Sequence, residues 1–260
     1  MPNPHPKQKI VLKFGTGVLS RAKGGAINTS QIRRIANEVA TLHANGCHCI
    51  IVTSAAIAAG VATLGLLARP DDLPGKQACA AVGQPELMRH YATAFRRHSL
   101  HVAQLLLTHS DLDSRIRQNN ARNTLIRLLE KRTIIPIINE NDSVATEEVR
   151  FGDNDRLSAE VAVLIQADRL LILTSSDGLT DSSENRIPIV KNLHEALPHI
   201  RPEKGPLSTG GMKTKIEAVN IALQAGIPAT ILDGRKPGQI LLGAQGADAG
   251  TRFIPSHHLV

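Results

Sequence analysis

Short apolar runs alternate with helical segments along most of this chain, and that alternation limits the possible folds more than any other feature. The apolar runs that we interpret as strands are residues 9–14, 47–53, 101–107, 133–138, 169–174 and 227–232. Between them, apolar residues recur at helical spacing, as Ile32, Ile35, Val39 and Leu42 do. Mostly apolar strands separated by helices favour an α/β fold, a three-layer α/β/α sandwich around a mostly parallel central sheet.

The length of 260 residues fits one large α/β domain or two small ones. We predict an N-terminal tail over residues 1–8 and a single domain over residues 9–260. Within it, a helix carrying Leu87, Tyr91 and Phe95 is predicted to follow Pro85. The tail lacks the apolar core of a signal peptide, and no apolar run approaches the length of a membrane span. The expectation is a soluble, cytoplasmic protein that does not enter a membrane.

The composition weighs against two other classes of protein. A formal charge of +7 and a pI of about 9.6 suit nucleic acid, but they also suit an enzyme that handles ATP and an anionic acid. Aromatic residues are scarce, so the stacking platforms of single-stranded nucleic-acid binders are missing and no specific nucleic-acid partner is expected. The three cysteines form no disulfide framework, and Cys47-His48-Cys49 is spaced too tightly for a common metal site.

Two polar blocks lie close together in the middle of the chain, at residues 139–142 (Asn-Glu-Asn-Asp) and 152–155 (Gly-Asp-Asn-Asp). They contain four carboxylates and three carboxamides, with no Cys or His to indicate zinc. A cluster this polar is costly to bury without partners. We interpret it as a solvent-open site that binds a polar substrate.

The ends of the predicted strands carry the other candidate residues. Ligands of parallel sheets bind beyond the carboxyl ends of the strands, and Gly15, Ser54, Asn139 and Ser175 all lie at such ends. Together with the polar blocks and the Lys-Gly elements described next, this placement indicates phosphoryl transfer to a small acid.

Two Lys-Gly elements are candidates for binding phosphate. Lys13 precedes a Gly-Thr-Gly turn at residues 15–17, and residues 209–215 are a glycine-rich stretch that opens a helix. Each has a simpler interpretation, an exposed lysine before a turn in the first case and a flexible loop in the second. Within the second element, Lys213 competes with Lys215 as the lysine that points toward the phosphates.

Taken in order, these blocks resemble the glutamate 5-kinases of the amino acid kinase family. The resemblance runs from about residue 9 to residue 238 and implies the amino acid kinase fold. The matching motifs are VLKFGT (11–16), IVTS (51–54), KQA (76–78), VGQ (82–84), NAR (120–122), NEND (139–142), FGDND (151–155) and TGGM (209–212). The NEND and FGDND pair argues for this branch against the aspartokinase, uridylate kinase and acetylglutamate kinase branches.

The resemblance implies a reaction and a role for each matching residue. ATP, with Mg²⁺, would phosphorylate the side-chain carboxylate of L-glutamate, the first step of proline synthesis. The N-terminal part of the domain would bind glutamate and the C-terminal part the nucleotide. The catalytic residues would be Lys13, Lys215 and Asp155, which orients the two lysines. Glutamate would be bound by Ser54, Asp142 and Asn154. The nucleotide site would be lined by Lys13, Gly15, Thr174, Ser175, Thr209, Gly210, Gly211, Met212, Lys213, Thr214 and Lys215.

The chain also departs from the family pattern. Ala55 stands where a glycine is usual, Ser175 where an aspartate is usual, and Gly17 and Thr180 replace a serine and an aromatic residue. These departures motivate an alternative, a non-catalytic sensor that binds glutamate or proline on the same fold. The resemblance further implies a homo-oligomer (dimer or tetramer), and makes feedback by proline an expectation. The C-terminal RNA-binding-like domain of many relatives is not expected in this chain.

Overall fold

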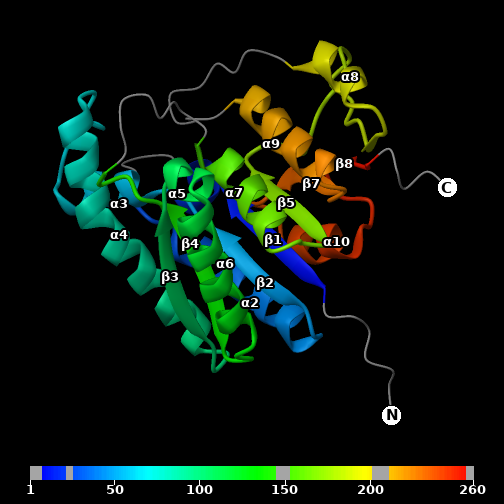
Figure 1. Ribbon diagram of the computed structural model, residues 1–260. Coiled ribbons are helices and arrows are strands. Elements are labelled where there is room, and N and C mark those ends of the chain that lie inside the picture. The colour runs from blue at the N-terminus through cyan, green and yellow to red at the C-terminus, as the bar shows by residue number, and fades with distance from the viewer. Residues whose placement is uncertain (1–7, 22–25, 145–152, 201–210, 256–260) are drawn as a thin grey trace.

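The computed structural model describes residues 8–21, 26–144, 153–200 and 211–255, and its strands form one sheet of eight (Figure 1). The order is β3-β4-β2-β1-β5-β7-β8-β6, and every neighbouring pair is parallel except β7 with β8. The bounds are β1 (Lys9–Phe14), β2 (His48–Val52), β3 (His101–Leu107), β4 (Ile134–Glu140), β5 (Arg169–Thr174), β6 (Ile189–Val190), β7 (Ala229–Asp233) and β8 (Thr251–Phe253). The predicted mostly parallel sheet is confirmed, and the short strands β6 and β8 are additions that the apolar pattern did not indicate.

Helices cover both faces of the sheet, which explains why its strands are apolar along their whole length. In β1, Ile10 and Leu12 belong to the buried cluster that includes side chains of α2, α4 and α10, whereas Val11 belongs to the one that includes side chains of α6, α7 and α9. The helices are α1 (Thr16–Leu19), α2 (Thr29–Ala44), α3 (Ala56–Thr63), α4 (Leu73–Arg96), α5 (His109–Asp113), α6 (Arg115–Leu129), α7 (Asp153–Leu164), α8 (Leu193–Ala196), α9 (Met212–Gln224) and α10 (Gln239–Gln245). The three-layer arrangement follows from the two buried faces.

One predicted helix begins much earlier than expected. Helix α4 starts at Leu73 and contains Pro85, so the prediction that the helix follows this proline is wrong. Proline weakens a helix interior because it lacks an N–H group. Tertiary packing compensates here, because α4 lies very close to α3 where Gly83 meets the carbonyl oxygen of Ala56 and Gly60 meets that of Cys79. The glycines allow this approach and fix the start of α3.

The strand order collects the polar loops at one edge. Strands β4, β2, β1 and β5 are neighbours, so Asp142, Ser54, Gly15 and Ser175, which follow them, lie along the same carboxyl edge. Strand β4 extends beyond the predicted end and includes Asn139 and Glu140, both buried.

Two further observations concern membrane helices and the cysteines. Among the described residues, no helix combines the length and apolarity that a membrane crossing requires. Cys47, Cys49 and Cys79 carry free thiols. The division into a tail over residues 1–8 and one domain over residues 9–260 stays a prediction.

Candidate active site

Two lysines and one aspartate from three different elements meet at the carboxyl edge. Lys13 lies near the end of β1, Asp155 in the first turn of α7 and Lys215 in the first turn of α9. The Nζ atom of Lys13 lies 2.7 Å from Oδ1 of Asp155, and that of Lys215 lies 3.4 Å from Oδ2. The hydroxyl of Thr214 donates a hydrogen bond of 2.9 Å to the same Oδ2. Asp155 therefore holds two ammonium groups side by side.

Burial makes this cluster electrostatically strong. The side chain of Asp155 is 1% exposed, and those of Lys13 and Lys215 are 8% and 6% exposed. Burial acts to raise the pKa of Asp155, but the charges of Lys13 and Lys215 and the hydrogen bonds outweigh it and hold the pKa below its ordinary value of 3.8. For Lys13, burial and the charge of Lys215 lower the pKa below 10.5 against the opposing attraction of Asp155. With both lysines protonated, the cluster is net positive and attracts an anionic group.

The glycine turn after β1 lies beside this cluster and the end of β5. The N–H group of Gly15 donates to the carbonyl oxygen of Leu173 at 3.1 Å, and a methyl group built at Gly15 would lie 3.6 Å from Nζ of Lys13. A methyl group at Gly17 would lie 3.6 Å from Oγ of Ser175. The structure thus brings Lys13, Gly15, Ser175 and the adjoining Thr174 together, as a phosphate-binding wall requires.

The start of α9 distinguishes the two candidate lysines. Lys215 is buried against Asp155 and also donates to the carbonyl oxygen of Gly211 at 3.3 Å. Lys213 is 79% exposed and lies 4.0 Å from Glu217 on the outer side of the helix. Lys215 therefore joins the cluster and Lys213 does not. Met212 and Thr214 share this first turn, whereas Thr209 and Gly210 lie outside the described residues.

The predicted glutamate-binding residues surround a neighbouring part of the edge. Asp142 lines a small hollow, and Ser54 follows the adjacent strand β2. Oδ1 of Asn154 accepts a hydrogen bond of 3.3 Å from the N–H group of Glu140. This bond holds the side-chain oxygen of Asn154 at the end of β4. The hollow is lined by Ala56, Ala80, Gln84, Leu106, Glu140, Asn141, Asp142 and Ser143.

Ala55 occupies an unusual backbone conformation directly before α3. Its φ and ψ angles are 81° and 9°, in the left-handed region that glycine adopts freely. An L-residue with a Cβ atom is strained there by about 1–2 kcal/mol. The chain therefore keeps a glycine-type turn beside Ser54 despite the alanine.

One charged residue near the hollow was missed by the sequence reasoning. Burial lowers the pKa of Arg69, which lies between α3 and α4, and the charge of Asp142 acts in the opposite direction, so the two side chains lie close together. An arginine at this point adds positive charge beside a site for an acidic substrate. No motif surrounds Arg69, and a lone arginine in a polar loop resembles an ordinary solvated residue, so the sequence offered no signal for it.

Comparison with known proteins identifies the class to which this fold and site belong. Residues 8–233 match the model of the amino acid kinase family, and the chain belongs to that family. It is 44% identical to the glutamate 5-kinase of Thermus thermophilus over 252 residues, which cover 95% of this chain and 67% of that enzyme. The glutamate 5-kinase of Dehalococcoides mccartyi is 44% identical over 261 residues, 96% of this chain and 69% of that enzyme. The resemblance predicted from the motifs is confirmed.

Solved structures of lower identity share the fold. UMP kinase from Bacillus anthracis superposes with a TM-score of 0.63 at 15% identity, covering 96% of this chain and 97% of that chain. N-acetylglutamate synthase from Neisseria gonorrhoeae, complexed with coenzyme A and L-arginine, gives a TM-score of 0.65 at 14% identity over 95% of this chain and 61% of that chain. The predicted amino acid kinase fold is thus confirmed by its structural neighbours.

Proposed function

We propose that this chain transfers the γ-phosphoryl group of ATP to the side-chain carboxylate of L-glutamate, the first step of proline biosynthesis. The products are L-glutamyl 5-phosphate and ADP. The observation that carries the proposal is Asp155, which holds Lys13 and Lys215 together at the carboxyl edge of the sheet. The glutamate 5-kinases that the chain matches over nearly all of its length support the choice of substrate.

The reaction requires the protein mainly to position the reactants and to stabilise negative charge. A glutamate carboxylate is ionised at pH 7 and attacks without a general base. Negative charge on the transferring phosphoryl oxygens is then stabilised by Lys13 and Lys215, which Asp155 orients. Asn154 and Asp142 would bind the glutamate, Asn154 by donating to a carboxylate and Asp142 by accepting from the ammonium group. Ser54 would complete the glutamate site, and the turn at Gly15 and the start of α9 would hold the phosphates.

We expect a magnesium ion to enter with the nucleotide, and we assign no side chain as its ligand. Within residues 8–21, 26–144, 153–200 and 211–255, no group of three or more His, Cys, Asp or Glu side chains gathers into a metal cage. Mg²⁺ bound through phosphate oxygens and water needs only one or two carboxylates. Such an ion would neutralise phosphate charge, while Asp155 is paired with the two lysines.

Hydroxylamine trapping tests the reaction directly. With ATP, Mg²⁺ and L-glutamate, the protein should release ADP and form the hydroxamate of an acyl phosphate in equal amounts. L-Aspartate and N-acetylglutamate should give little of either product. Absence of turnover, with glutamate or proline still raising the melting temperature, would instead support the non-catalytic sensor. The retained lysine pair argues against that alternative, because binding glutamate alone does not need two cations held for a phosphoryl group.

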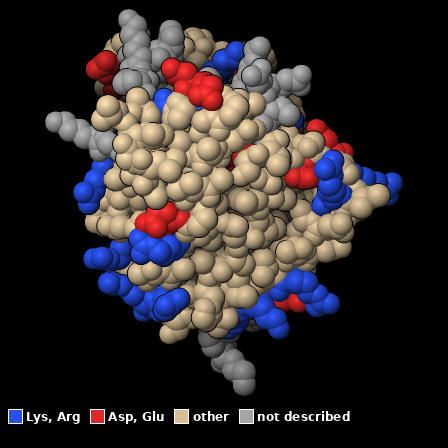
Figure 2. All heavy atoms as spheres, turned by 90° about the vertical axis from the view of Figure 1, so that its left-hand side faces the viewer, with Lys and Arg blue, Asp and Glu red and all other residues tan. Residues whose placement is uncertain are grey.

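Self-association and proline inhibition extend the same proposal. The face formed by α3, α4 and β3 has few charged side chains at its centre, and Lys and Arg lie mostly toward its rim (Figure 2). Strand β3 is an edge strand, and Leu64, Leu66 and Val82 nearby are exposed. An uncharged patch does not repel its own copy, so we assign this face to a second copy of the chain. Light scattering should give a dimer or larger species, and Val82→Asp should reduce the mass of that species.

For proline inhibition, we expect added proline to raise the KM for glutamate.

A further inference from the structure

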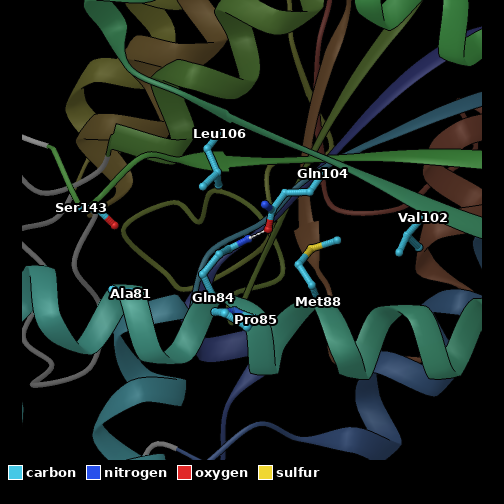
Figure 3. A pocket seen from close by; sticks show the side chains of 8 residues that line it. All are labelled: Ala81, Gln84, Pro85, Met88, Val102, Gln104, Leu106 and Ser143. Carbon is cyan, nitrogen blue, oxygen red and sulfur yellow. Dashed lines mark hydrogen bonds between the residues drawn. The ribbon is translucent and has the colours of Figure 1, made fainter.

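Three carboxamide side chains form a hydrogen-bonded relay from the outside of the sheet to the predicted glutamate site. Nε2 of Gln84, on α4, donates to Oε1 of Gln104, on edge strand β3, at 2.7 Å (Figure 3). Oε1 of Gln84 accepts a 2.8 Å hydrogen bond from Nδ2 of Asn139 at the end of β4. Both Nε2 and Oε1 of Gln84 thus form hydrogen bonds, and the carboxamide cannot rotate by half a turn without breaking both of them.

The inner end of the relay reaches the backbone that holds Asn154. Oδ1 of Asn139 accepts from the N–H group of Glu140 at 3.0 Å, and Oδ1 of Asn154 accepts from the same N–H group at 3.3 Å. The orientation of Asn139 therefore determines how much of this N–H group is available to Asn154. Because the hydrogen bond to the N–H group of Glu140 holds the side-chain Oδ1 of Asn154, it also defines the direction of the side-chain Nδ2.

Gln84 also lies between a largely apolar cleft and a smaller, more polar hollow. A cleft of about 500 Å³ between α4 and β3 is lined by Gln84, Gln104, Ser143 and apolar side chains that include Pro85 and Met88 (Figure 3). The smaller hollow on the other side contains Asp142, and Gln84 lines it too. Gln84 is 8% exposed and Asn139 is 1% exposed, so an unpaired amide at either position would be costly.

The backbone around Gln84 is held firmly. The adjacent Gly83 is pressed against the carbonyl oxygen of Ala56, at the start of α3, with no room for a methyl group. Gln84 is therefore fixed in position relative to both the turn at Ser54 and the end of β4. It is a rigid support for the polar residues that follow β4.

We propose that Gln84 is a positioning residue for glutamate binding, which acts through Asn139 to orient Asn154. The inference rests on the proposed function, because it assigns Asn154 to the glutamate site. The bonds described above for Lys13, Lys215 and Asp155 join these residues to one another, to Thr214 and to Gly211, so we do not expect Gln84 to act on the lysine pair. Its loss should therefore weaken glutamate binding and leave the phosphoryl-transfer step and ATP binding intact.

The test is Gln84→Met, which keeps the volume of the side chain and removes both hydrogen bonds. The KM for glutamate should rise about fivefold to twentyfold, as expected when a buried hydrogen bond is lost. The kcat and the KM for ATP should stay within about twofold, because a purely structural defect would lower kcat or affect both substrates. Met88→Leu, in the same cleft wall, is the matched control and should leave all three parameters unchanged.

Gln104→Met provides a milder version that does not disturb the interior. It frees Nε2 of Gln84 while leaving the bond to Asn139, so the KM for glutamate should rise about twofold to fourfold. If Gln84→Met does not fold, the KM for glutamate of Gln104→Met tests the role of Gln84. An unchanged KM for glutamate in the folded variant, measured in a preparation whose wild type turns over glutamate, overturns the role of Gln84. Absence of turnover in the wild type would instead overturn the proposed function.

Discussion

The Cα atom of Gly83 in α4 lies against the carbonyl oxygen of Ala56 in α3, so closely that a methyl group added there would come within 1.9 Å of that oxygen. Helix α3 begins at Ala56, directly after the turn at Ser54 and Ala55. The spacing of the two helices therefore determines where this part of the candidate site lies.

Gly83→Ala should separate α3 from α4 and reduce stability. We expect the free energy of unfolding to fall by about 3 kcal/mol, because overpacking against backbone cannot be relieved by a side-chain rotation. Urea denaturation measures the change. Gly243→Ala in α10 is the matched control: its methyl group would lie 3.4 Å from the side chain of Leu171, and the higher helix propensity of alanine should leave the protein within about 1 kcal/mol of the wild type or more stable.

Ala55→Gly should stabilise the protein, since it removes the left-handed strain at a φ angle of 81°. The gain should be about 0.5–1 kcal/mol after the greater flexibility of glycine in the unfolded chain is included. Turnover should be preserved or raised. Ala58→Gly, inside α3, should have the opposite effect and destabilise by about 1 kcal/mol. Thermal unfolding of the two variants shows whether each substitution raises or lowers stability. Equal destabilisation by both would contradict the strain at Ala55.

Lys215→Ala and Lys213→Ala should differ sharply, although both remove one lysine from the first turn of α9. Lys215 contacts Asp155, whereas Lys213 is 79% exposed. We expect kcat to fall at least about a hundredfold for Lys215→Ala, the scale for removing one electrostatic contact to a transition state, and to stay within about threefold for Lys213→Ala. Similar losses in both variants would show that charge at this helix matters more than contact with Asp155.

Asp155→Asn should change how stability depends on acid. Because the folded pKa of Asp155 lies below 3.8, its ionised form contributes stability that is complete well above that pH and is lost as the pH falls through the folded value. The wild type should therefore lose more stability than the variant between about pH 5 and pH 2. Chemical denaturation at each pH gives the two curves.

The sequence predicted the sheet well because its strands are buried on both faces. Val11 and Leu12 point to opposite helix layers, so the whole of β1 is apolar and stands out from the helices. Strands β6 and β8 have two and three residues, too few to produce a periodic signal. The start of α4 was missed because a proline usually marks a helix boundary, whereas the Asp72 N-cap and the close packing against α3 support the turns before Pro85.

The candidate site was predictable only in part. Strand ends and glycine turns indicated where Lys13 and Ser175 should lie, and the motifs of the family indicated Asp155 and Lys215. The glycine-rich stretch by itself left Lys213 and Lys215 open, because the choice depends on the rotation of α9, and only the resemblance favoured Lys215. The relay through Gln84 depends on contacts between α4, β3 and β4, and no local pattern encodes such contacts.

The cluster of Lys13, Asp155 and Lys215 is assembled from β1, α7 and α9, and its two lysines are separated by most of the chain. A fragment that lacks β1, α7 or α9 cannot bring Lys13 and Lys215 to the same carboxylate. Phosphoryl transfer therefore reports that these three elements have docked, which the recovery of secondary structure alone does not report. Activity should reappear only when the first strand has docked between β2 and β5 and α9 has packed on α7.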